Sequence, residues 1–221
     1  KKAVVLIDEY DVPLEKAYSN GYYREMIGVI GPLLQNALKS NTANLQFAVV
    51  TGCLRISRES IFTGLNNLDI NSIMSKSYGE FFGFTDYEVQ EACREYGITE
   101  KYSELKEWYN GYYFGEDNVY NPWSTILYIR DHWKSPDVFP VSYWANTSSN
   151  SIVRDLIDRA DRDIKDEIEG LIAGGTIEKP VHEDITYAEV NDKMDNLWNF
   201  MFFTGYFKKI SERFEERKCY V

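Results

Sequence analysis

The stretch VVLIDEYDVP, residues 4–13, joins a run of apolar residues directly to a group of acids. Residues 3–8 form a short segment that is rich in β-branched side chains and lacks an alternation of apolar and polar residues. This pattern predicts a strand buried on both faces. Asp8 and Glu9 stand at the carboxyl end of this strand. Since ligands of open α/β sheets bind at the carboxyl ends of parallel strands, the stretch predicts two carboxylates presented to a ligand.

A second strand of the same kind is predicted at residues 45–52 (LQFAVVTG), which end in Thr51 and Gly52. Residues 21–39, between the two strands, carry apolar residues at helical spacing and predict an amphipathic helix. A strand, a helix and a strand in this order form a βαβ unit with parallel strands and a right-handed crossover. Thr51 is therefore expected at the same edge of the sheet as Asp8.

An Asp–Glu pair at a strand end is suited to ATP hydrolysis. Asp8 would hold the water shell of Mg²⁺, and Glu9 would orient and polarise the attacking water. Thr51 would sense the γ-phosphate, and Arg55 or Arg58 would reach phosphate charge. Acids at a strand end and arginines in a loop are also ordinary solvated residues, so both interpretations stay open. The sequence contains no G-x-x-x-x-G-K-[ST], so it lacks the usual backbone cradle for phosphates.

Other residues of chemical interest are expected to have structural roles. Asp11 is expected to be a turn residue, and Cys53 a small buried side chain. His132 is expected on a helix surface, whereas Trp108 and Trp123 are expected in the core.

Composition limits the class of protein. Acids outnumber bases 35 to 24, and the net charge of −11 disfavours non-specific binding to nucleic acid or to anionic membranes. Three distant cysteines and two histidines make a zinc site or a disulfide framework improbable, which fits a reducing compartment. No apolar run approaches the roughly 18 residues of a membrane span, and no signal peptide is visible, so we expect a cytoplasmic protein.

Most of the remaining chain is predicted to be helical. A T-x-x-E capping box opens one helix at residues 85–97, and Asn121–Pro122 opens another that ends near residue 133. A Pro- and Ser-containing connection at residues 134–148 suggests a domain boundary. Further helices are predicted at residues 99–111, 150–160, 162–173 and within 192–210, with short strands at TIEKPV (176–181) and ITYAEV (185–190).

Seven stretches occur in one order along the chain: VVLIDEYDVP, VVTGCLRISRESIFTGLNN, GEFFGFTDYEV, KEWYNGYYFG, VYNPWS, YWANTSSN and LWNFMFFTGYFKK. Together they resemble the predicted AAA-ATPase-like family of bacterial and archaeal proteins. The resemblance implies a P-loop ATPase that uses ATP and Mg²⁺, often followed by a PD-D/E-x-K nuclease-like domain. It matches Asp8 and Glu9 to the Walker B acids, and Thr51 with Gly52 to the end of the sensor strand.

We therefore expect an α/β fold, with a partial P-loop NTPase-like parallel sheet followed by a helical and winged-helix-like lid. The expected domains are residues 1–134, the partial ATPase core, and residues 135–221, the lid. The chain is expected to be a fragment that begins at the Walker B strand. Its parent would hydrolyse ATP, whereas the fragment would be almost inactive and would self-associate through an open apolar edge.

Two other functions stay open. The acids could be structural, with an aromatic surface around residues 108–123 and 143–144 that binds a partner protein. Residues 165–210 could alternatively bind nucleic acid as a winged-helix-like module, using the basic residues near the C-terminus. The charge of −11 makes this third function the least favoured.

Overall fold

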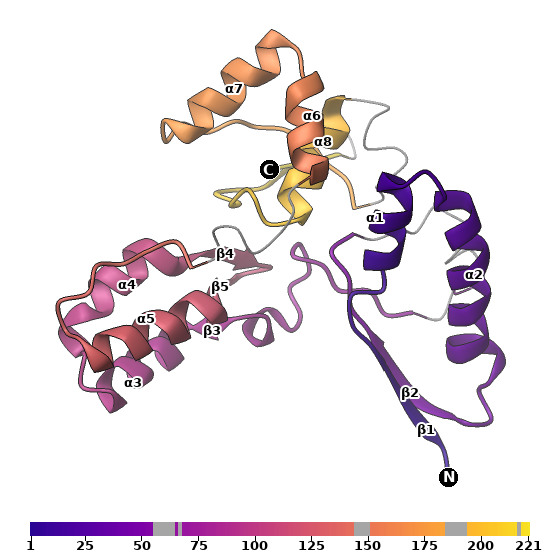
Figure 1. Ribbon diagram of the computed structural model, residues 1–221, viewed down its shortest axis with the longest axis horizontal. Coiled ribbons are helices and arrows are strands. Elements are labelled where there is room, and N and C mark those ends of the chain that lie inside the picture. Colours follow the sequence, from indigo (N-terminus) through magenta and orange to yellow (C-terminus); the bar gives the residue numbers. More distant parts are fainter. Residues whose placement is uncertain (55–64, 66–67, 144–150, 184–193, 216–217) are drawn as a thin grey trace. The chain divides into compact units, whose positions relative to one another are not determined.

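The computed structural model describes most of the chain, and its described residues form two compact units (Figure 1). The first unit is Lys1–Asp69 with Ser151–Val221, and the second is Ile70–Asn150. This division differs from the predicted domains at 1–134 and 135–221, which remain a prediction. The described residues are 1–54, 65, 68–143, 151–183, 194–215 and 218–221.

The first unit contains the predicted βαβ arrangement. Strand β1 (Ala3–Ile7) pairs in parallel with β2 (Leu45–Val50), which confirms the expected strand direction. Helix α1 (Val12–Ser19), which the sequence pattern did not reveal, and helix α2 (Tyr23–Gln35) lie between the strands in sequence. A short π-helical turn, Asn36–Ser40, follows α2. The α/β fold class is thus confirmed, while a P-loop core remains a prediction.

Only one face of the β1–β2 pair is packed in the described part of the chain. Its inward side chains include Ile7 and Val50, which are paired in register and contact the core of the first unit. The prediction that both faces are buried is wrong for these residues, because the core side chains of α1 and α2 cover one face alone. The other face exposes large apolar side chains, with Leu6 at 70% exposure. These outward residues are Val4, Leu6, Phe47 and Val49.

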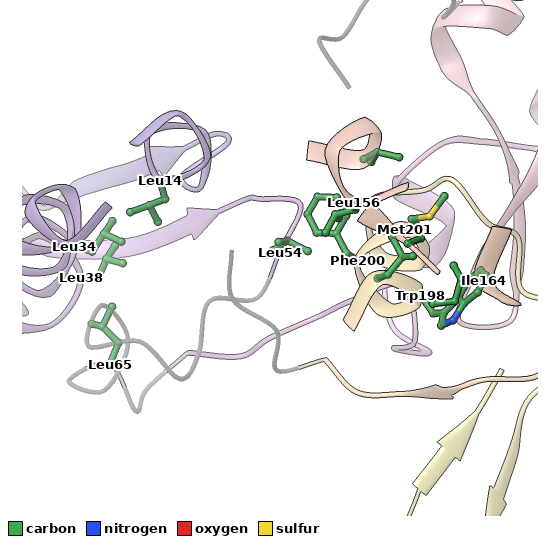
Figure 2. Packing of buried hydrophobic residues seen from close by; sticks show 13 residues of the cluster. Leu14, Leu34, Leu38, Leu54, Leu65, Leu156, Ile164, Trp198, Phe200 and Met201 are labelled. Carbon is green, nitrogen blue, oxygen red and sulfur yellow. The ribbon is translucent and has the colours of Figure 1, made fainter. Parts of the chain in front are cut away.

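The core of the first unit joins its N-terminal and C-terminal parts. Leu14 of α1 and Leu34 of α2 belong to the same buried cluster as Leu156, Ile164 and Phe200 (Figure 2). The latter three come from helices α6 (Ser151–Arg159), α7 (Arg162–Ile172) and α8 (Met194–Phe203). These helices confirm the predictions for residues 150–160 and 162–173 and for a helix within 192–210.

A small antiparallel sheet completes the described C-terminal part. Strands β6 (Pro180–Val181), β7 (Arg213–Glu215) and β8 (Lys218–Tyr220) pair in the order β6-β8-β7. Of the predicted strand TIEKPV, the last two residues form β6, and Lys179 extends the pairing through two backbone hydrogen bonds with Val221. The predicted strand ITYAEV lies outside the described residues. The described C-terminal part contains helices and a small antiparallel sheet, which are the element types of a winged helix. A winged-helix-like lid itself remains a prediction.

The second unit packs three helices against an antiparallel sheet. Helices α3 (Asp86–Glu95), α4 (Tyr102–Tyr109) and α5 (Pro122–Lys134) confirm the three predicted helices. Strands β3 (Phe84–Thr85), β4 (Asn110–Phe114) and β5 (Asp117–Tyr120) pair in the order β3-β5-β4 and were not predicted. Two single 3₁₀ turns, Gly79–Phe81 and Thr99–Lys101, precede β3 and α4.

Both predicted helix caps are present. The Thr85 hydroxyl accepts the backbone N–H of Glu88 at 3.3 Å, and the Glu88 carboxylate accepts the backbone N–H of Thr85 at 2.8 Å. The Asn121 side chain accepts the Ser124 N–H at 2.9 Å. These bonds satisfy N–H groups that a helix start otherwise leaves without partners, so the capping motifs fix where α3 and α5 begin.

Three predicted environments in the second unit are wrong. Trp108 and Trp123 are each 51% exposed instead of belonging to the core. His132 is 1% exposed instead of lying on the surface, because it shares the inward face of α5 with Tyr128 and Ile129. Its Nδ1 lies 3.0 Å from the carbonyl oxygen of Tyr128, and its Nε2 lies 3.6 Å from a carboxylate oxygen of Glu104 on α4. Residue type alone did not reveal which side of each helix faces inward.

A carboxylate at the start of α3 ties the second unit together. Asp86 Oδ1 accepts hydrogen bonds from the hydroxyls of Tyr102 at 2.5 Å and Tyr120 at 2.6 Å, and from Lys106 Nζ at 3.1 Å. Its Oδ2 accepts a bond from Gln90 at 2.6 Å. Burial alone would raise the pKa of Asp86, but these four hydrogen bonds outweigh burial and lower the pKa below its usual range.

We predict that the contribution of Asp86 to stability falls in acid. Its pKa is lower in the folded than in the unfolded chain, so the stabilisation is present above the unfolded pKa of about 3.9 and is lost as the pH falls towards the folded pKa. Asp86→Asn should lower the free energy of unfolding by about 1–2 kcal/mol near neutral pH, a value discounted for partial exposure. The difference from wild type should shrink near pH ~3, measured by urea unfolding at both pH values.

The matched control is Asp137→Asn, because Asp137 is an exposed residue of the same unit. That variant should follow wild type at both pH values. An Asp86→Asn variant equally destabilised near pH ~3 and near neutral pH would contradict the role of the charged carboxylate.

Candidate functional site

The pairing of β1 and β2 continues past the ends of both strands. The backbone N–H of Thr51 donates to the carbonyl oxygen of Ile7 at 2.9 Å, and the N–H of Tyr10 donates to the carbonyl oxygen of Thr51 at 2.9 Å. The carboxyl ends of the two parallel strands are therefore held together by backbone hydrogen bonds on both sides of Asp8 and Glu9.

Asp8 and Thr51 lie in direct contact at these strand ends. The Thr51 hydroxyl donates a short hydrogen bond to Asp8 Oδ1 and accepts the backbone N–H of Glu9 at 3.1 Å. All three residues are exposed. The expected proximity of the threonine and the first acid is confirmed, whereas their roles in catalysis or cofactor binding remain predictions.

Glu9 has a strained backbone. Its φ of +52° lies in the left-handed region, which residues with a Cβ atom rarely occupy. Such a conformation costs about 1 kcal/mol and persists where the surrounding structure fixes it. Here the Glu9 N–H is held by the Thr51 hydroxyl, and the following N–H of Tyr10 is held by the Thr51 carbonyl. The second acid is thus turned away from the strand direction at the edge of the sheet.

Asp11 has a larger role than the predicted turn residue. It is 1% exposed, and its Oδ2 accepts the backbone N–H groups of Cys53 and Leu54, each at 3.0 Å. It is also the residue immediately before α1, and its carbonyl oxygen accepts the N–H of Leu14 at 2.9 Å. An Asp just before a Pro-containing helix start suggests a helix cap. No signal in the sequence indicated that the Asp11 side chain bonds instead to the loop after β2.

Gly52 is required by the close approach of the two strand ends. A Cβ atom at this position would overlap the ring of Tyr10 and would lie 2.8 Å from Asp11 Oδ1. The Tyr10 hydroxyl also donates a short hydrogen bond to the carbonyl oxygen of Leu54. The glycine therefore lets the side chains of Tyr10 and Asp11 reach across to residues 53 and 54.

The strand ends carry a strongly negative field. Cys53 is exposed, contrary to the prediction that it is buried, although its thiol is partly shielded from solvent. This partial burial, followed by the nearby charges of Asp11, Glu9 and Glu15, raises the pKa of the Cys53 thiol to about 11. Burial and the charge of Asp11 likewise raise the pKa of Glu15. A cation would be stabilised at this edge, and a second anion would be repelled.

Two predicted site residues cannot be placed. Arg55, predicted as catalytic, and Arg58 lie outside the described residues. Among the residues that the structure describes, no group of three or more His, Cys, Asp or Glu side chains has the arrangement of a metal site. The oxygen donors that the fold brings together are those of Asp8 and Thr51, with Glu9 adjacent in sequence.

The fold and the strand-end acids define the class of protein: an α/β protein with acidic residues at the carboxyl ends of parallel strands. Comparison with protein families gives the particular family. The family described as "Predicted AAA-ATPase" matches residues 1–62, which contain β1, β2 and the strand-end acids Asp8, Glu9, Asp11 and Glu15. Over this segment the chain is therefore similar to the predicted AAA-ATPase family.

A longer relative extends the similarity beyond this segment. The chain is 31% identical over 160 residues to the "Uncharacterized protein in vnfD 5′region" of Azotobacter chroococcum mcd 1. The matched region covers 71% of this chain and 29% of that relative, so the chain spans less than a third of the length of the protein it matches. No solved structure matches the chain. Within the described residues, no helix is both long and apolar enough to cross a membrane.

We predict that the strain at Glu9 reverses the usual order of alanine and glycine. Glu9→Gly and Glu9→Ala both remove the carboxylate, but only glycine adopts a positive φ without strain. Glu9→Gly should therefore be more stable than Glu9→Ala by about 1 kcal/mol in chemical denaturation. At Glu25, in the first turn of α2, glycine should instead be less stable than alanine by roughly 1 kcal/mol. The same order at both positions would contradict a left-handed Glu9.

Proposed function

We propose that this chain supplies the acidic strand-end residues of an ATP-hydrolysing site. The observation that carries the proposal is the hydrogen bond from Thr51 to Asp8 across the ends of two adjacent parallel strands. The match of residues 1–62 to the predicted AAA-ATPase family supports the choice of ATP. The proposal extends to the whole protein. The whole protein would bind and hydrolyse ATP, and it would contain a phosphate loop and a nuclease-like domain.

The donors at the strand ends fit Mg²⁺. This ion prefers oxygen ligands, keeps several waters and is bound through one or two carboxylates together with substrate phosphates. An exposed carboxylate beside a hydroxyl meets that requirement, and the absence of a three-ligand cluster in the described residues is compatible with it. Asp8 would hold the ion, and Thr51 would hold the Asp8 carboxylate in place. When bound, Mg²⁺ neutralises phosphate charge.

The remaining roles follow from the position of each side chain. Glu9, turned out of the strand by its left-handed backbone, would orient the attacking water and accept its proton. Thr51, whose hydroxyl contacts both Asp8 and the Glu9 backbone, would respond to the state of the phosphates. Arg55 would stabilise phosphate charge from the loop that follows. These assignments remain proposals.

The negative field at the strand ends makes the site depend on cations. Asp8, Glu9, Asp11 and Glu15 would repel the phosphates of a nucleotide that arrives without a metal ion or basic side chains. The field thus favours binding of a metal–nucleotide complex over binding of the nucleotide alone. A nucleotide would bind in preference to an uncharged substrate only when a metal ion or basic side chains supply positive charge.

The two alternatives differ in their support. A protein-interaction module is compatible with the exposure of Trp108 and Trp123, whereas Trp144 lies outside the described residues. For a nucleic-acid module, Lys209 is paired with Glu212, and Arg213 with Glu178 and Glu215, which reduces the positive charge available to phosphates. Neither alternative accounts for the contact between Asp8 and Thr51 as directly as the ATPase does.

We predict that Glu9→Gln abolishes ATP turnover without abolishing ATP binding. Glutamine keeps the size of the side chain but cannot accept the proton of the attacking water. In the full-length gene product, phosphate release should fall by about 100-fold or more, while nucleotide affinity changes little.

The matched control is Glu25→Gln, because Glu25 is an exposed residue of α2 in the same unit. It should hydrolyse ATP like wild type. Unchanged phosphate release in Glu9→Gln would remove Glu9 from the mechanism, and a wild type that neither binds nor hydrolyses ATP would refute the proposed function.

We predict that Mg²⁺ lowers the pKa of the Cys53 thiol from its value of about 11. A cation at the strand ends would offset the carboxylates that disfavour the thiolate. The rate of iodoacetamide labelling at Cys53, followed by peptide mass spectrometry, should therefore rise in millimolar Mg²⁺. The buried Cys93 serves as an internal reference. Asp8→Asn should remove the response, and an equal response to NaCl of the same ionic strength would indicate screening and not a bound metal.

A further inference from the structure

We propose that Asp11, assisted by Tyr10, is a positioning residue that holds Thr51 against Asp8 and Glu9. The proposal rests on the function proposed above and adds a residue to which we gave no catalytic or metal-binding role. Its basis is a set of hydrogen bonds, here named the strand-end clamp, that join residues 10 and 11 to residues 53 and 54.

The clamp continues the pairing of the two strands where the regular ladder stops. Up to Thr51, backbone groups of the two strands bond to each other. Beyond it, side chains take over: Tyr10 bonds to the carbonyl oxygen of Leu54, and Asp11 bonds to the N–H groups of Cys53 and Leu54. The residues before and after Thr51 are therefore hydrogen-bonded to the other strand end, which restricts movement of the Thr51 hydroxyl away from Asp8 and Glu9.

The anchor points of the clamp are rigid. Asp11 immediately precedes α1, which buries Leu14 and Ala17 completely. On the other side, Leu54 is 2% exposed and belongs to the core of the first unit. The Asp11 carboxylate therefore joins a helix start to a core residue, and catalytic groups need to be held to within about 0.5 Å of their productive positions.

The position of the clamp makes its effect specific. The bonds do not include the reacting side chains themselves, but they begin one residue after Glu9 and two residues after Thr51. Loss of the clamp should leave Asp8 and Glu9 chemically intact while the Thr51 hydroxyl samples other positions. We therefore expect a loss in kcat and not in nucleotide binding.

The test measures backbone exchange and turnover in the same variants. Asp11→Ala removes the acceptor, Asp11→Asn keeps an acceptor oxygen without the charge, and Tyr10→Phe removes only the bond to Leu54. Glu25→Gln is the matched control, because it removes an exposed carboxylate of the same unit that has no part in the clamp or in the strand-end field. Hydrogen exchange resolved by NMR follows the amides of Glu9, Cys53 and Leu54.

In Asp11→Ala, the amides of Cys53 and Leu54 should exchange at least about tenfold faster, and so should the Glu9 amide that donates to the Thr51 hydroxyl. In the full-length protein, kcat per folded molecule should fall about 10- to 100-fold with a small change in KM. Asp11→Asn and Tyr10→Phe should be intermediate, and Glu25→Gln should match wild type. Because Asp11→Ala could fail to fold, the two milder variants carry the same test.

Each of the following outcomes would contradict a separate part of the proposal. Unchanged exchange at Glu9 when Cys53 and Leu54 lose protection would show that the clamp does not position Thr51. A fall in melting temperature with unchanged kcat per folded molecule would make Asp11 purely structural. If wild type has no Glu9-dependent ATP turnover, the proposed function fails, and exchange at Glu9 alone decides whether Asp11 positions Thr51.

Discussion

The parallel pairing of β1 with β2 is the constraint on which the candidate site depends. Parallel strands bring their carboxyl ends to the same edge, so residues separated by more than 40 positions in sequence come within hydrogen-bond distance. The bond between Thr51 and Asp8, the left-handed turn at Glu9 and the buried carboxylate of Asp11 all lie beyond that shared edge. Antiparallel pairing would place these groups at opposite ends of the strands.

The second unit depends on the same kind of chemistry for another purpose. There a single carboxylate, Asp86, gathers two phenols, an ammonium group and an amide, and so joins α3, α4 and β5. In the first unit the acids beyond β1 either remain exposed, as Asp8 and Glu9 do, or bind the opposite loop, as Asp11 does. Where the acid is surrounded by donors it stabilises the fold, and where it is exposed it remains available to a ligand.

Much of the local structure could be predicted from particular residues. The apolar run into Asp8, the capping box at Thr85 and the Asn121 cap each identify an element through interactions between near neighbours in sequence. Helix α1 and the β3-β5-β4 sheet were missed because short elements give weak periodicity, and the hairpin strands contain Asn110, Asp117 and Asn118, residue types that are uncommon in strands.

The long-range details of the site could not be predicted in the same way. The partner of Asp11 is a pair of backbone N–H groups more than 40 residues away, and backbone groups have no sequence signature. The burial of His132 and the exposure of Trp123 depend on which side of α5 faces α3 and α4. Such facts follow from packing, which residue types limit but do not determine.

The exposed face of the β1–β2 pair has a practical consequence for protein engineering. Val4, Leu6, Phe47 and Val49 project away from the core, so their replacement by threonine or lysine leaves the packing of Ile7 and Val50 untouched. A redesigned chain of this kind would be more soluble at the concentrations that spectroscopy needs and would retain the strand-end geometry. Successive side chains of a strand point to opposite faces. The outward side chains of β1 and β2 therefore affect solubility, whereas the inward side chains support the candidate site.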